Sequence, residues 1–271
     1  MAPTPKDLAQ AFHALHHRDR VLVLPNAWDA GSARLIESCG AEAIATTSAG
    51  VAWANGHPDG QAIPFQRVVD GVAAIARVVR IPVSADIEAG SSADPETVGE
   101  HVTAVIDAGA VGINLEDGRE SPDVTARKIA AARAAADRAG VPLFINARTD
   151  TYLKKLVPPE QAVGETLARA KRYRDAGASG IFAPRLKAPD EIRTIAGAVG
   201  LPLNVLAVPG LAPVEELGAL GVRRVSVGGG VARAACVAAR EAVRSLLQTG
   251  RYDVLFAGAD SLDMNALLSG R

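Results

Sequence analysis

The sequence predicts an α/β protein in which eight parallel strands close into a (β/α)8 barrel. Short apolar runs alternate with Ala-rich amphipathic stretches along the whole chain. Eight such pairs fit into 271 residues, close to the usual size of one barrel domain. Gly and Pro recur at the boundaries, where a helix ends and a strand begins. We therefore expect one domain that spans residues 1–271.

Each predicted strand is apolar at nearly every position, as expected for a strand that is buried on both faces. Gly-Ala, Gly-Val or Pro precedes several of these runs, because Gly closes a helix and Pro prevents it from continuing. The predicted strands, in order, are Val21–Leu24, Ala43–Thr47, Val83–Ile87, Val111–Leu115, Leu143–Ala147, Gly180–Ala183, Leu203–Leu206 and Arg224–Val227.

The segments between the strands are predicted to be helices. Five of them begin with Pro in or beside the first turn, where its missing N–H group costs nothing. The predicted helices are Ala30–Ser38, Pro64–Val79, Pro95–Ala108, Val124–Ala139, Pro159–Ala176, Pro189–Ala198, Pro213–Leu220 and Ala232–Gln248.

An open, doubly wound sheet is the alternative fold. The first strand is not followed by a Gly-rich dinucleotide-binding turn but by the segment 25–29, Pro-Asn-Ala-Trp-Asp, which disfavours that alternative. Three glycines, Gly228 to Gly230, follow the last strand. They are equally consistent with an anion-binding turn and with a plain tight turn into the last helix.

The composition limits the classes of partner. The 29 Lys and Arg residues nearly balance the 30 Asp and Glu residues, so the formal charge is −1 at pH 7. This balance gives no reason to expect nucleic acid or an acidic membrane surface. No apolar run approaches the ~20 residues of a membrane span. Two distant Cys residues suggest a reducing compartment, so we expect a cytoplasmic protein that binds a small molecule.

Acidic residues lie at the predicted carboxyl ends of the strands, where barrels carry their chemistry. Asp86 and Glu116 end neighbouring strands and should face one pocket. Two converging carboxylates repel unless a cation or a shared proton joins them. Oxygen ligands without nearby His or Cys favour Mg²⁺ or Mn²⁺ over Zn²⁺. A structural ion pair with Arg148 is an equally good interpretation of these residues.

Arg148, on the next strand, is the natural clamp for a substrate carboxylate or phosphonate, because its planar fork makes two parallel hydrogen bonds. No Lys lies inside a predicted strand, where a Schiff-base Lys of a barrel aldolase would be. A carbanion formed here would therefore need a metal rather than an imine.

Four motifs in these strand ends resemble the isocitrate lyase / phosphoenolpyruvate mutase superfamily, in order and over nearly the whole chain. The resemblance implies a (β/α)8 TIM barrel, often with the last helix exchanged between subunits of a homodimer or homotetramer. It also implies Mg²⁺ and a small 2-oxo or 2-hydroxy carboxylic acid or phosphonate as substrate. The motifs are Thr47-Ser48-Ala49-Gly50-Val51-Ala52, Ser84-Ala85-Asp86-Ile87-Glu88-Ala89-Gly90, Asn114-Leu115-Glu116-Asp117 and Asn146-Ala147-Arg148-Thr149-Asp150.

The resemblance also implies roles for individual residues. Asp86 matches the second Asp of the family's Asp-Ala-Asp metal motif, and Glu116 matches an acidic residue that supports the metal through water. Asp59 matches an acidic residue that reaches the metal's water shell, and Arg148 matches the Arg that holds a carboxylate. The backbone amides of the segment Thr47, Ser48 and Ala49 match the loop that holds the oxo-acid carboxylate.

Two departures from the family pattern stand out. Ser84 occupies the place of the first metal Asp, so Asp86 is expected to be the only direct protein ligand, with Glu88 restoring the missing charge. The segment Asp117–Asp123 is short and lacks the Cys and His of the isocitrate and methylisocitrate lyases, which argues against isocitrate or methylisocitrate as substrate.

The remaining polar residues allow more than one interpretation. His57, close to Asp59, is either a general acid and substrate ligand or a solvated loop residue. Asn204, in the seventh strand, is a candidate substrate ligand, and Arg185 is either a second anion clamp or half of an ion pair. The His residues at 13, 16 and 17 are expected to lie on a solvated helix face.

Together these features predict a Mg²⁺-dependent lyase. It should act on a C–C bond of a small 2-oxo or 2-hydroxy carboxylic acid, by decarboxylation or cleavage of an oxaloacetate-like acid through a metal-stabilised enolate. Arg148, Glu116 and His57 are the expected catalytic residues. A phosphonomutase or another P–C bond enzyme is the alternative, and a barrel that binds an oxo acid without turnover is the alternative of another class.

Overall fold

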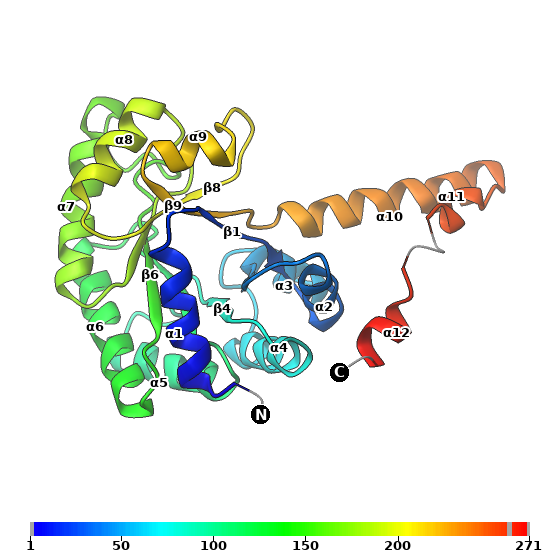
Figure 1. Cartoon of the computed structure of the whole chain (residues 1–271), viewed down its shortest axis with the longest axis horizontal. Coiled ribbons are helices and arrows are strands. Elements are labelled where there is room, and N and C mark those ends of the chain that lie inside the picture. The colour runs from blue at the N-terminus through cyan, green and yellow to red at the C-terminus, as the bar shows by residue number, and fades with distance from the viewer. Residues whose placement is uncertain (1–2, 259–261, 270–271) are drawn as a thin grey trace.

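The computed structural model describes residues 3–258 and 262–269 of the chain. Its core is a parallel sheet that curves into a nearly closed barrel, with helices around the outside (Figure 1). The strands are β1 (Leu22–Leu24), β2 (Asn26–Ala27), β3 (Ile44–Thr46), β4 (Val83–Asp86), β5 (Gly112–Glu116), β6 (Phe144–Arg148), β7 (Gly180–Phe182), β8 (Leu203–Leu206) and β9 (Val222–Ser226).

The first and last strands close the barrel. The strand order is β1-β9-β8-β7-β6-β5-β4-β3-β2, and Pro25 alone separates β1 from β2. The two are halves of one interrupted strand: Leu22 of β1 pairs with Arg224 of β9, whereas Asn26 of β2 pairs with Ala45 of β3. Pro25 lacks an N–H group, so the interruption falls where the ladder would otherwise lose a hydrogen bond.

The predicted barrel and the order of its strands are confirmed. Each predicted strand has a counterpart whose ends differ by at most two residues, apart from the short continuation β2. The helices are α1 (Pro5–His16), α2 (Ala30–Ser38), α3 (Ser48–Ala54), α4 (Phe65–Val78), α5 (Pro95–Asp107), α6 (Pro122–Ala139), the 3-10 turn η1 (Pro159–Gln161), α7 (Ala162–Asp175), α8 (Pro189–Ala198), α9 (Val214–Ala219), α10 (Gly230–Thr249), α11 (Asp253–Phe256) and α12 (Met264–Ser269).

Helix α1 closes the amino end of the barrel. A capping box between Thr4 and Asp7 starts the helix. Phe12 is fully buried against Phe144, the first residue of β6, with ring centroids 5.5 Å apart. The His16 ring stacks on Phe144 at 3.8 Å. The prediction that these histidines lie on a solvated face is therefore wrong for His16, because α1 turns that face onto the barrel.

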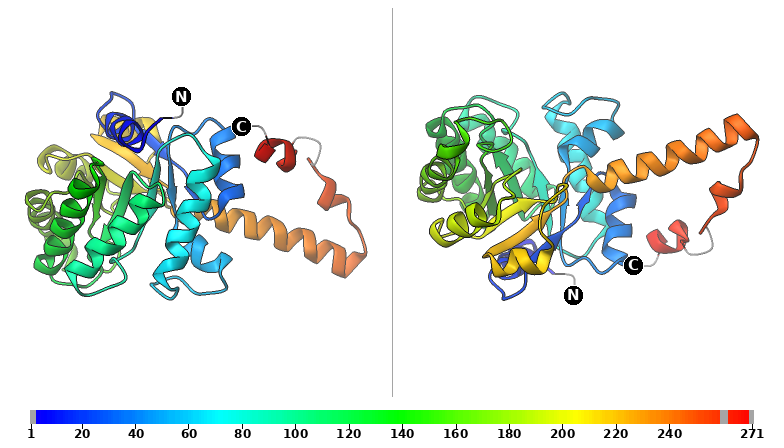
Figure 2. Two further views of the ribbon diagram at one scale, coloured as in Figure 1. Left: turned by 90° about the horizontal axis from the view of Figure 1, so that it is seen from below. Right: turned by 90° about the horizontal axis from the view of Figure 1, so that it is seen from above.

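Helix α10 leaves the barrel and forms a long arm with α11, as Figures 1 and 2 show. The chain then returns, and α12 contacts α2, where Arg34 Nε donates to the carbonyl of Leu267 at 3.0 Å. The arm exposes apolar side chains to a degree unusual for a stable surface. They include Val237, Val243, Leu247, Val254, Leu255 and Phe256. Within the described residues, no helix is long and apolar enough to cross a membrane.

Candidate functional site

A cavity of about 530 Å³ opens at the carboxyl ends of the barrel strands. We call it the central cavity. Eight of its lining residues end a strand or follow one directly, so the barrel itself brings them together. Those eight are Thr47, Asp86, Arg148, Phe182, Leu206, Ala207, Ser226 and Val227. Asn114, from the middle of β5, also lines the cavity. Arg185 and Arg233 also line it, as does the turn of Gly228, Gly229 and Gly230 that leads into α10.

Asp86 ends β4 and is held by backbone groups. Its Oδ2 accepts the Ser48 N–H at 3.3 Å, and its Oδ1 accepts the Glu88 N–H at 3.4 Å. Its own N–H donates to Thr46 Oγ1 at 2.8 Å. Burial raises the pKa of Asp86, against the opposing attraction of Arg148. Both contacts to the carboxylate are long, so each oxygen retains a lone pair for a ligand.

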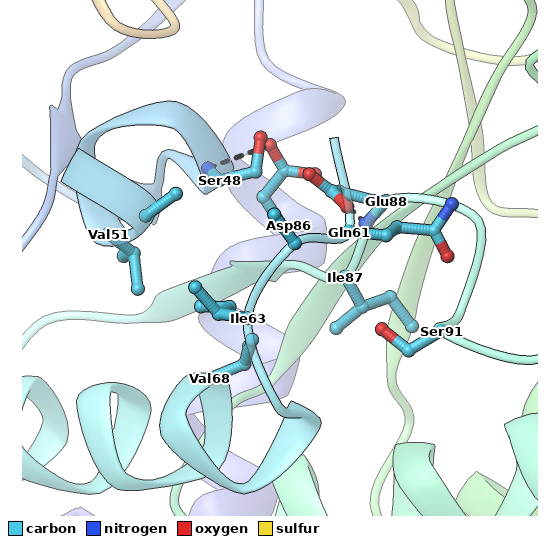
Figure 3. A pocket seen from close by; sticks show the side chains of 11 residues that line it. Ser48, Val51, Gln61, Ile63, Val68, Asp86, Ile87, Glu88 and Ser91 are labelled. Carbon is cyan, nitrogen blue, oxygen red and sulfur yellow. Dashed lines mark hydrogen bonds between the residues drawn. The ribbon is translucent and has the colours of Figure 1, made fainter. Parts of the chain in front are cut away.

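Glu88 lies beside Asp86, above a smaller side pocket of about 20 Å³. Figure 3 shows the two carboxylates near Ser48, with Val51, Ile63 and Ile87 forming an apolar wall below. Gly60 N–H donates to Glu88 Oε1 at 3.3 Å. Burial, with the charges of Asp86 and Asp59, raises the pKa of Glu88 to about 7. Glu88 also holds the left-handed value φ 51°, a strained conformation typical of functional sites.

Ser84 lies one layer lower in the barrel. It is fully buried, and its Oγ has no hydrogen-bond partner among the described residues. It lines neither the central cavity nor the side pocket. Asp86 lines both cavities and Glu88 lines the side pocket, whereas the side chain at position 84 lines neither of them.

Arg148 is paired on two sides. Its Nη1 lies 2.6 Å from Glu116 Oε2, its neighbour in the β5–β6 register. Its Nε and Nη2 donate to the two carboxylate oxygens of Asp150, at 2.7 and 3.1 Å. This is the ion pair that the sequence left as an alternative. One N–H on each terminal nitrogen remains for a ligand, and Arg148 does line the central cavity.

Glu116 shares a negative environment with its neighbours. Burial raises its pKa to about 8, assisted by the charges of Asp86 and Asp150, while Arg148 acts in the opposite direction. The side chain of Glu116 is 13% exposed, but it does not line the central cavity. Arg148 therefore reaches the central cavity, and Glu116 contacts Arg148 without reaching the cavity itself.

The segment predicted as an amide-bearing loop is the start of α3. Thr47 N–H donates to the Ala27 carbonyl at 3.0 Å, and Ser48 N–H is used by Asp86. Ala49 N–H is a first-turn helix amide with no partner among the described residues. All three residues line the central cavity, but only the Ala49 amide is available to a ligand.

Three further predicted residues lie in different environments. Asp59 is exposed and lines the central cavity, close enough to Glu88 to affect its pKa. Asn204 is buried beneath the cavity, where its Oδ1 accepts the Ser226 hydroxyl at 3.3 Å. His57 is exposed after α3 and lines neither the central cavity nor the side pocket.

Sequence reasoning did not assign a role to Asn26 or Arg233. Asn26 Nδ2 donates to the Thr46 carbonyl at 2.8 Å, while its Oδ1 accepts the N–H groups of Val227 and Gly228 at 3.0 and 2.9 Å. It therefore fastens the glycine turn to the strands opposite. Its position at the end of the first strand was the available signal. Arg233 stacks over Trp53 at 5.9 Å, and no local motif marks it.

The donor set fits a hard divalent cation. No group of three His, Cys, Asp or Glu side chains in the described part of the chain is arranged to hold a metal. Mg²⁺ does not require one, since it is commonly bound by one or two carboxylates and keeps several waters. Asp86, Glu88 and Glu116 all have raised pKa values, mainly because of burial. A cation would relieve that excess of buried negative charge.

Comparisons with known proteins agree with this geometry. Residues 12–247 match the family of phosphoenolpyruvate phosphomutase. An uncharacterised Mycobacterium tuberculosis protein is 39% identical over 236 residues, which cover 87% of this chain and 88% of that protein. A solved Burkholderia cenocepacia J2315 structure, provisionally named a phosphonomutase, is 42% identical with a TM-score of 0.84. That match covers 88% of this chain and 99% of the other.

Two further relatives carry names that state an activity. An oxaloacetate decarboxylase of Ectopseudomonas mendocina is 30% identical over 275 residues, covering 96% of this chain and 88% of that protein. The structure of a phosphonopyruvate hydrolase in complex with oxalate and Mg²⁺ is 28% identical, with a TM-score of 0.83. It covers 97% of this chain and 94% of its own. This protein is therefore a member of the phosphoenolpyruvate mutase/isocitrate lyase superfamily of lyases and mutases.

Proposed function

We propose that this protein is a Mg²⁺-dependent carbon–carbon lyase that acts on an oxaloacetate-like 2-oxo acid. The observation that carries the proposal is the division of charge around the central cavity. Carboxylates of Asp59 and Asp86 line it, and so do guanidinium groups of Arg148, Arg185 and Arg233. A small acid with two anionic ends matches such a cavity, one end toward a cation and the other toward arginine.

Asp86 is the residue that would hold Mg²⁺ directly, since backbone N–H groups already fix its carboxylate. Glu88, Asp59 and Glu116 would act through the waters of the ion. When bound, Mg²⁺ supplies a Lewis acid that draws negative charge from the keto oxygen of the substrate. A relative of this chain has been solved with oxalate and Mg²⁺ together, which supports the choice of ion.

The remaining residues would orient the substrate. The Ala49 amide and the free N–H groups of Arg148 face the central cavity and can bind a carboxylate. Arg185 and Arg233 form no ion pair with any described residue, so their charges are available to a second anionic group. Arg148→Lys should therefore affect substrate binding more than a surface substitution of the same kind.

Decarboxylation is the reaction we favour within this class. The turn between β5 and α6 is short and offers neither Cys nor His to move a proton. Cleavage of isocitrate-like acids needs such a group, whereas loss of CO₂ needs an electron sink and fewer positioned acids. The similarity to an oxaloacetate decarboxylase supports this choice.

A phosphonate-specific enzyme is the second candidate. Arg148 is already paired with acidic residues, whereas Arg185 and Arg233 form no described ion pair, and the three together suit the extra negative charge of a phosphonate. Two similar structures also bear names of phosphonate enzymes. A barrel that binds an oxo acid without turnover is the candidate of another class, because no His, Cys, Lys or Tyr among the described residues lines the cavity.

One assay distinguishes these functions. Purified protein is given oxaloacetate or phosphonopyruvate, with Mg²⁺ or with EDTA, and the formation of pyruvate and of phosphoenolpyruvate is measured. Our proposal requires Mg²⁺-dependent release from oxaloacetate above the rate of Mg²⁺ alone. Formation of either product from phosphonopyruvate only would favour the phosphonate enzyme. A thermal shift with both acids and no product would favour the binding protein.

We also propose that the protein assembles into a homodimer or homotetramer through the arm of α10 and α11. The arm carries exposed apolar side chains, among them Leu247 and Phe256, which are 78% and 66% exposed. Burial of such a patch against a second copy would remove this apolar area from water.

A further inference from the structure

A buried arginine lies inside the barrel, beneath the central cavity. Arg224 is on β9, next to Leu22 and Asn204 in the strand register, and it is fully buried. Its Nη2 lies 3.2 Å from Asn114 Oδ1. Its Nε and Nη1 have no hydrogen-bond partner among the described residues, and none of the described ion pairs involves it. Such a residue is costly to bury, which calls for an explanation.

The contact with Arg224 determines how Asn114 is oriented. An Arg side chain can only donate, so the Asn114 atom that faces it has to be the oxygen. Asn146 Nδ2 approaches the same oxygen, at 2.8 Å. Reversing the Asn114 amide would set its N–H groups against those of Arg224. The two donors that face this side of the amide, from Arg224 and Asn146, therefore require the oxygen of Asn114 to point toward them.

The amide nitrogen of Asn114 is consequently turned the other way. Asn114 lines the central cavity, and it is the register neighbour of Asp86 on the adjacent strand. Its Nδ2 makes no hydrogen bond with any described residue, and it is not one of the fully buried atoms that lack a partner. The atom is therefore not completely enclosed by protein. Its two N–H groups are therefore left without a partner in a residue that lines the cavity beside the proposed cation site.

We propose that Asn114 donates a hydrogen bond to an anionic oxygen of the substrate, and that Arg224 is the positioning residue that fixes this donor. The inference rests on the proposed function, because the oxygen belongs to the oxo acid. A fixed, neutral donor stabilises charge that develops on a keto or carboxylate oxygen without having to reorient during the reaction. It also adds no further negative charge beside Asp86 and Glu88.

The geometry gives Arg224 a reason to be buried without a carboxylate. Burial lowers the pKa of Arg224 to about 9, against the opposing attraction of Asp86. The side chain is therefore cationic at neutral pH. Arg224 and Asn146 together hold Asn114 from below, so the donor is set before any substrate binds.

The test uses the full chain with Mg²⁺ and oxalate, a stable dianion. Asn114→Asp keeps an acceptor for Arg224 and the shape of the side chain but removes the donor. We expect it to fold and to bind oxalate at least about 10- to 100-fold more weakly, through the lost hydrogen bond and through repulsion between the new carboxylate and the dianion. Asn114→Leu, which adds no charge, should still lose about tenfold or more through the missing donor alone. Asn265→Asp, the same chemical change in the distant helix α12, should bind like the wild type.

Arg224→Met tests the positioning role. It should weaken oxalate binding in the wild-type background and have no further effect in an Asn114→Leu background, because Arg224 acts only through Asn114. A purely structural role would instead weaken binding equally in both backgrounds.

A measurement on unmodified protein covers the case in which Arg224→Met does not fold. The side-chain NH₂ signals of Asn114, identified by their loss in Asn114→Asp, should exchange with water faster than those of Asn146. They should also shift on addition of oxalate. If oxalate binds while these signals stay unmoved and Asn114→Asp binds normally, the inference is overturned and the proposed function stands. If the wild type binds no oxalate, the proposed function fails, and this inference fails with it.

Discussion

Arg148 connects two acidic side chains in the site. It lies between Glu116 and Asp150, each within hydrogen-bonding distance, and still reaches the central cavity. Such a shared guanidinium has two consequences. It partly neutralises carboxylates that burial would otherwise protonate, and it limits its own freedom to follow a substrate.

Arg148→Lys should reduce binding of an oxo acid by about 10- to 100-fold, because a single ammonium cannot replace three directed contacts. Oxalate titration in the presence of Mg²⁺ measures the effect. Lys171→Arg, on an exposed face of α7, is the matched control and should leave binding unchanged. An unaltered affinity in Arg148→Lys would show that Arg148 serves the fold alone.

Asp86→Asn tests the metal site. The side chain keeps its size, but its oxygen no longer carries the charge that attracts Mg²⁺. We expect loss of Mg²⁺-dependent pyruvate release and at least about a tenfold higher Mg²⁺ concentration for half-saturation. Activity that still responds to Mg²⁺ in the same range would reject Asp86 as ligand.

His16 should make stability depend on pH. Burial, followed by repulsion from Arg224, lowers its pKa from 6.5 to about 2, so the folded protein keeps the ring neutral. The unfolded chain takes up a proton as the pH falls below about 6.5. The contribution of His16 to the stability is therefore complete above that pH and decreases by about 1.4 kcal/mol per pH unit below it. Glu88 and Glu116, whose pKa values are raised in the folded protein, act in the opposite direction over the same range.

Urea unfolding between pH 7.5 and 5 measures this slope. His16→Phe removes the titrating ring and should reduce the slope by about one proton, whereas the exposed His17→Gln should leave it unchanged. An identical slope in His16→Phe would mean that other groups cause the loss.

Helix α3 shows how a short element positions the site. It begins at Thr47, whose Oγ1 accepts the Gly50 N–H, and it brings Ser48 to Asp86 and Ala49 to the cavity. A Cβ at Gly50 would lie 2.7 Å from Thr47 Cγ2 and 2.8 Å from Trp28 Cβ. Only a residue without a side chain therefore allows α3 to pack this closely.

Gly50→Ala should destabilise the protein by about 1–3 kcal/mol through this overpacking. Because α3 has to shift, Mg²⁺ and oxalate affinity should fall as well. Gly71→Ala in α4 is the matched control: a Cβ there meets nothing within 4 Å, and the change should stabilise the helix slightly. Thermal unfolding of both variants checks the sign. Equal melting temperatures would contradict the tight packing at α3.

The sequence was sufficient for the strands because a barrel strand is apolar on both faces and therefore apolar at nearly every position. It was not sufficient for α3, since seven residues are too few to display a 3.6-residue period. The site was likewise predicted only in part. The strand ends predicted which residues come together. They did not predict that the N–H groups of Thr47 and Ser48 donate to Ala27 and Asp86, because those acceptors lie on neighbouring strands.

The extended arm dominates the outline of the whole molecule. Helix α10 begins at the glycine turn of the cavity and ends far from the barrel (Figure 2). Any partner that covers its apolar side chains would therefore contact an element that starts in the site.

Leu247→Glu should dissociate the proposed oligomer, because an exposed apolar contact becomes a buried charge in the assembly. Light scattering coupled to size-exclusion chromatography measures the mass, and circular dichroism checks that the barrel persists. Gln248→Glu, one residue further along α10, should keep the wild-type mass. A wild-type monomer at high concentration would refute the assembly.

The interrupted first strand has a consequence for biosynthesis. Asn26 and Gly228, which meet at the seam of the barrel, are 202 residues apart. Most of the chain must leave the ribosome before β1 can find β9, so the nascent barrel carries open sheet edges for much of its synthesis. Chaperone demand should consequently be concentrated before residue 226 emerges, and a circular permutant that starts between β5 and α6 would place β9 before β1 and let the seam form earlier.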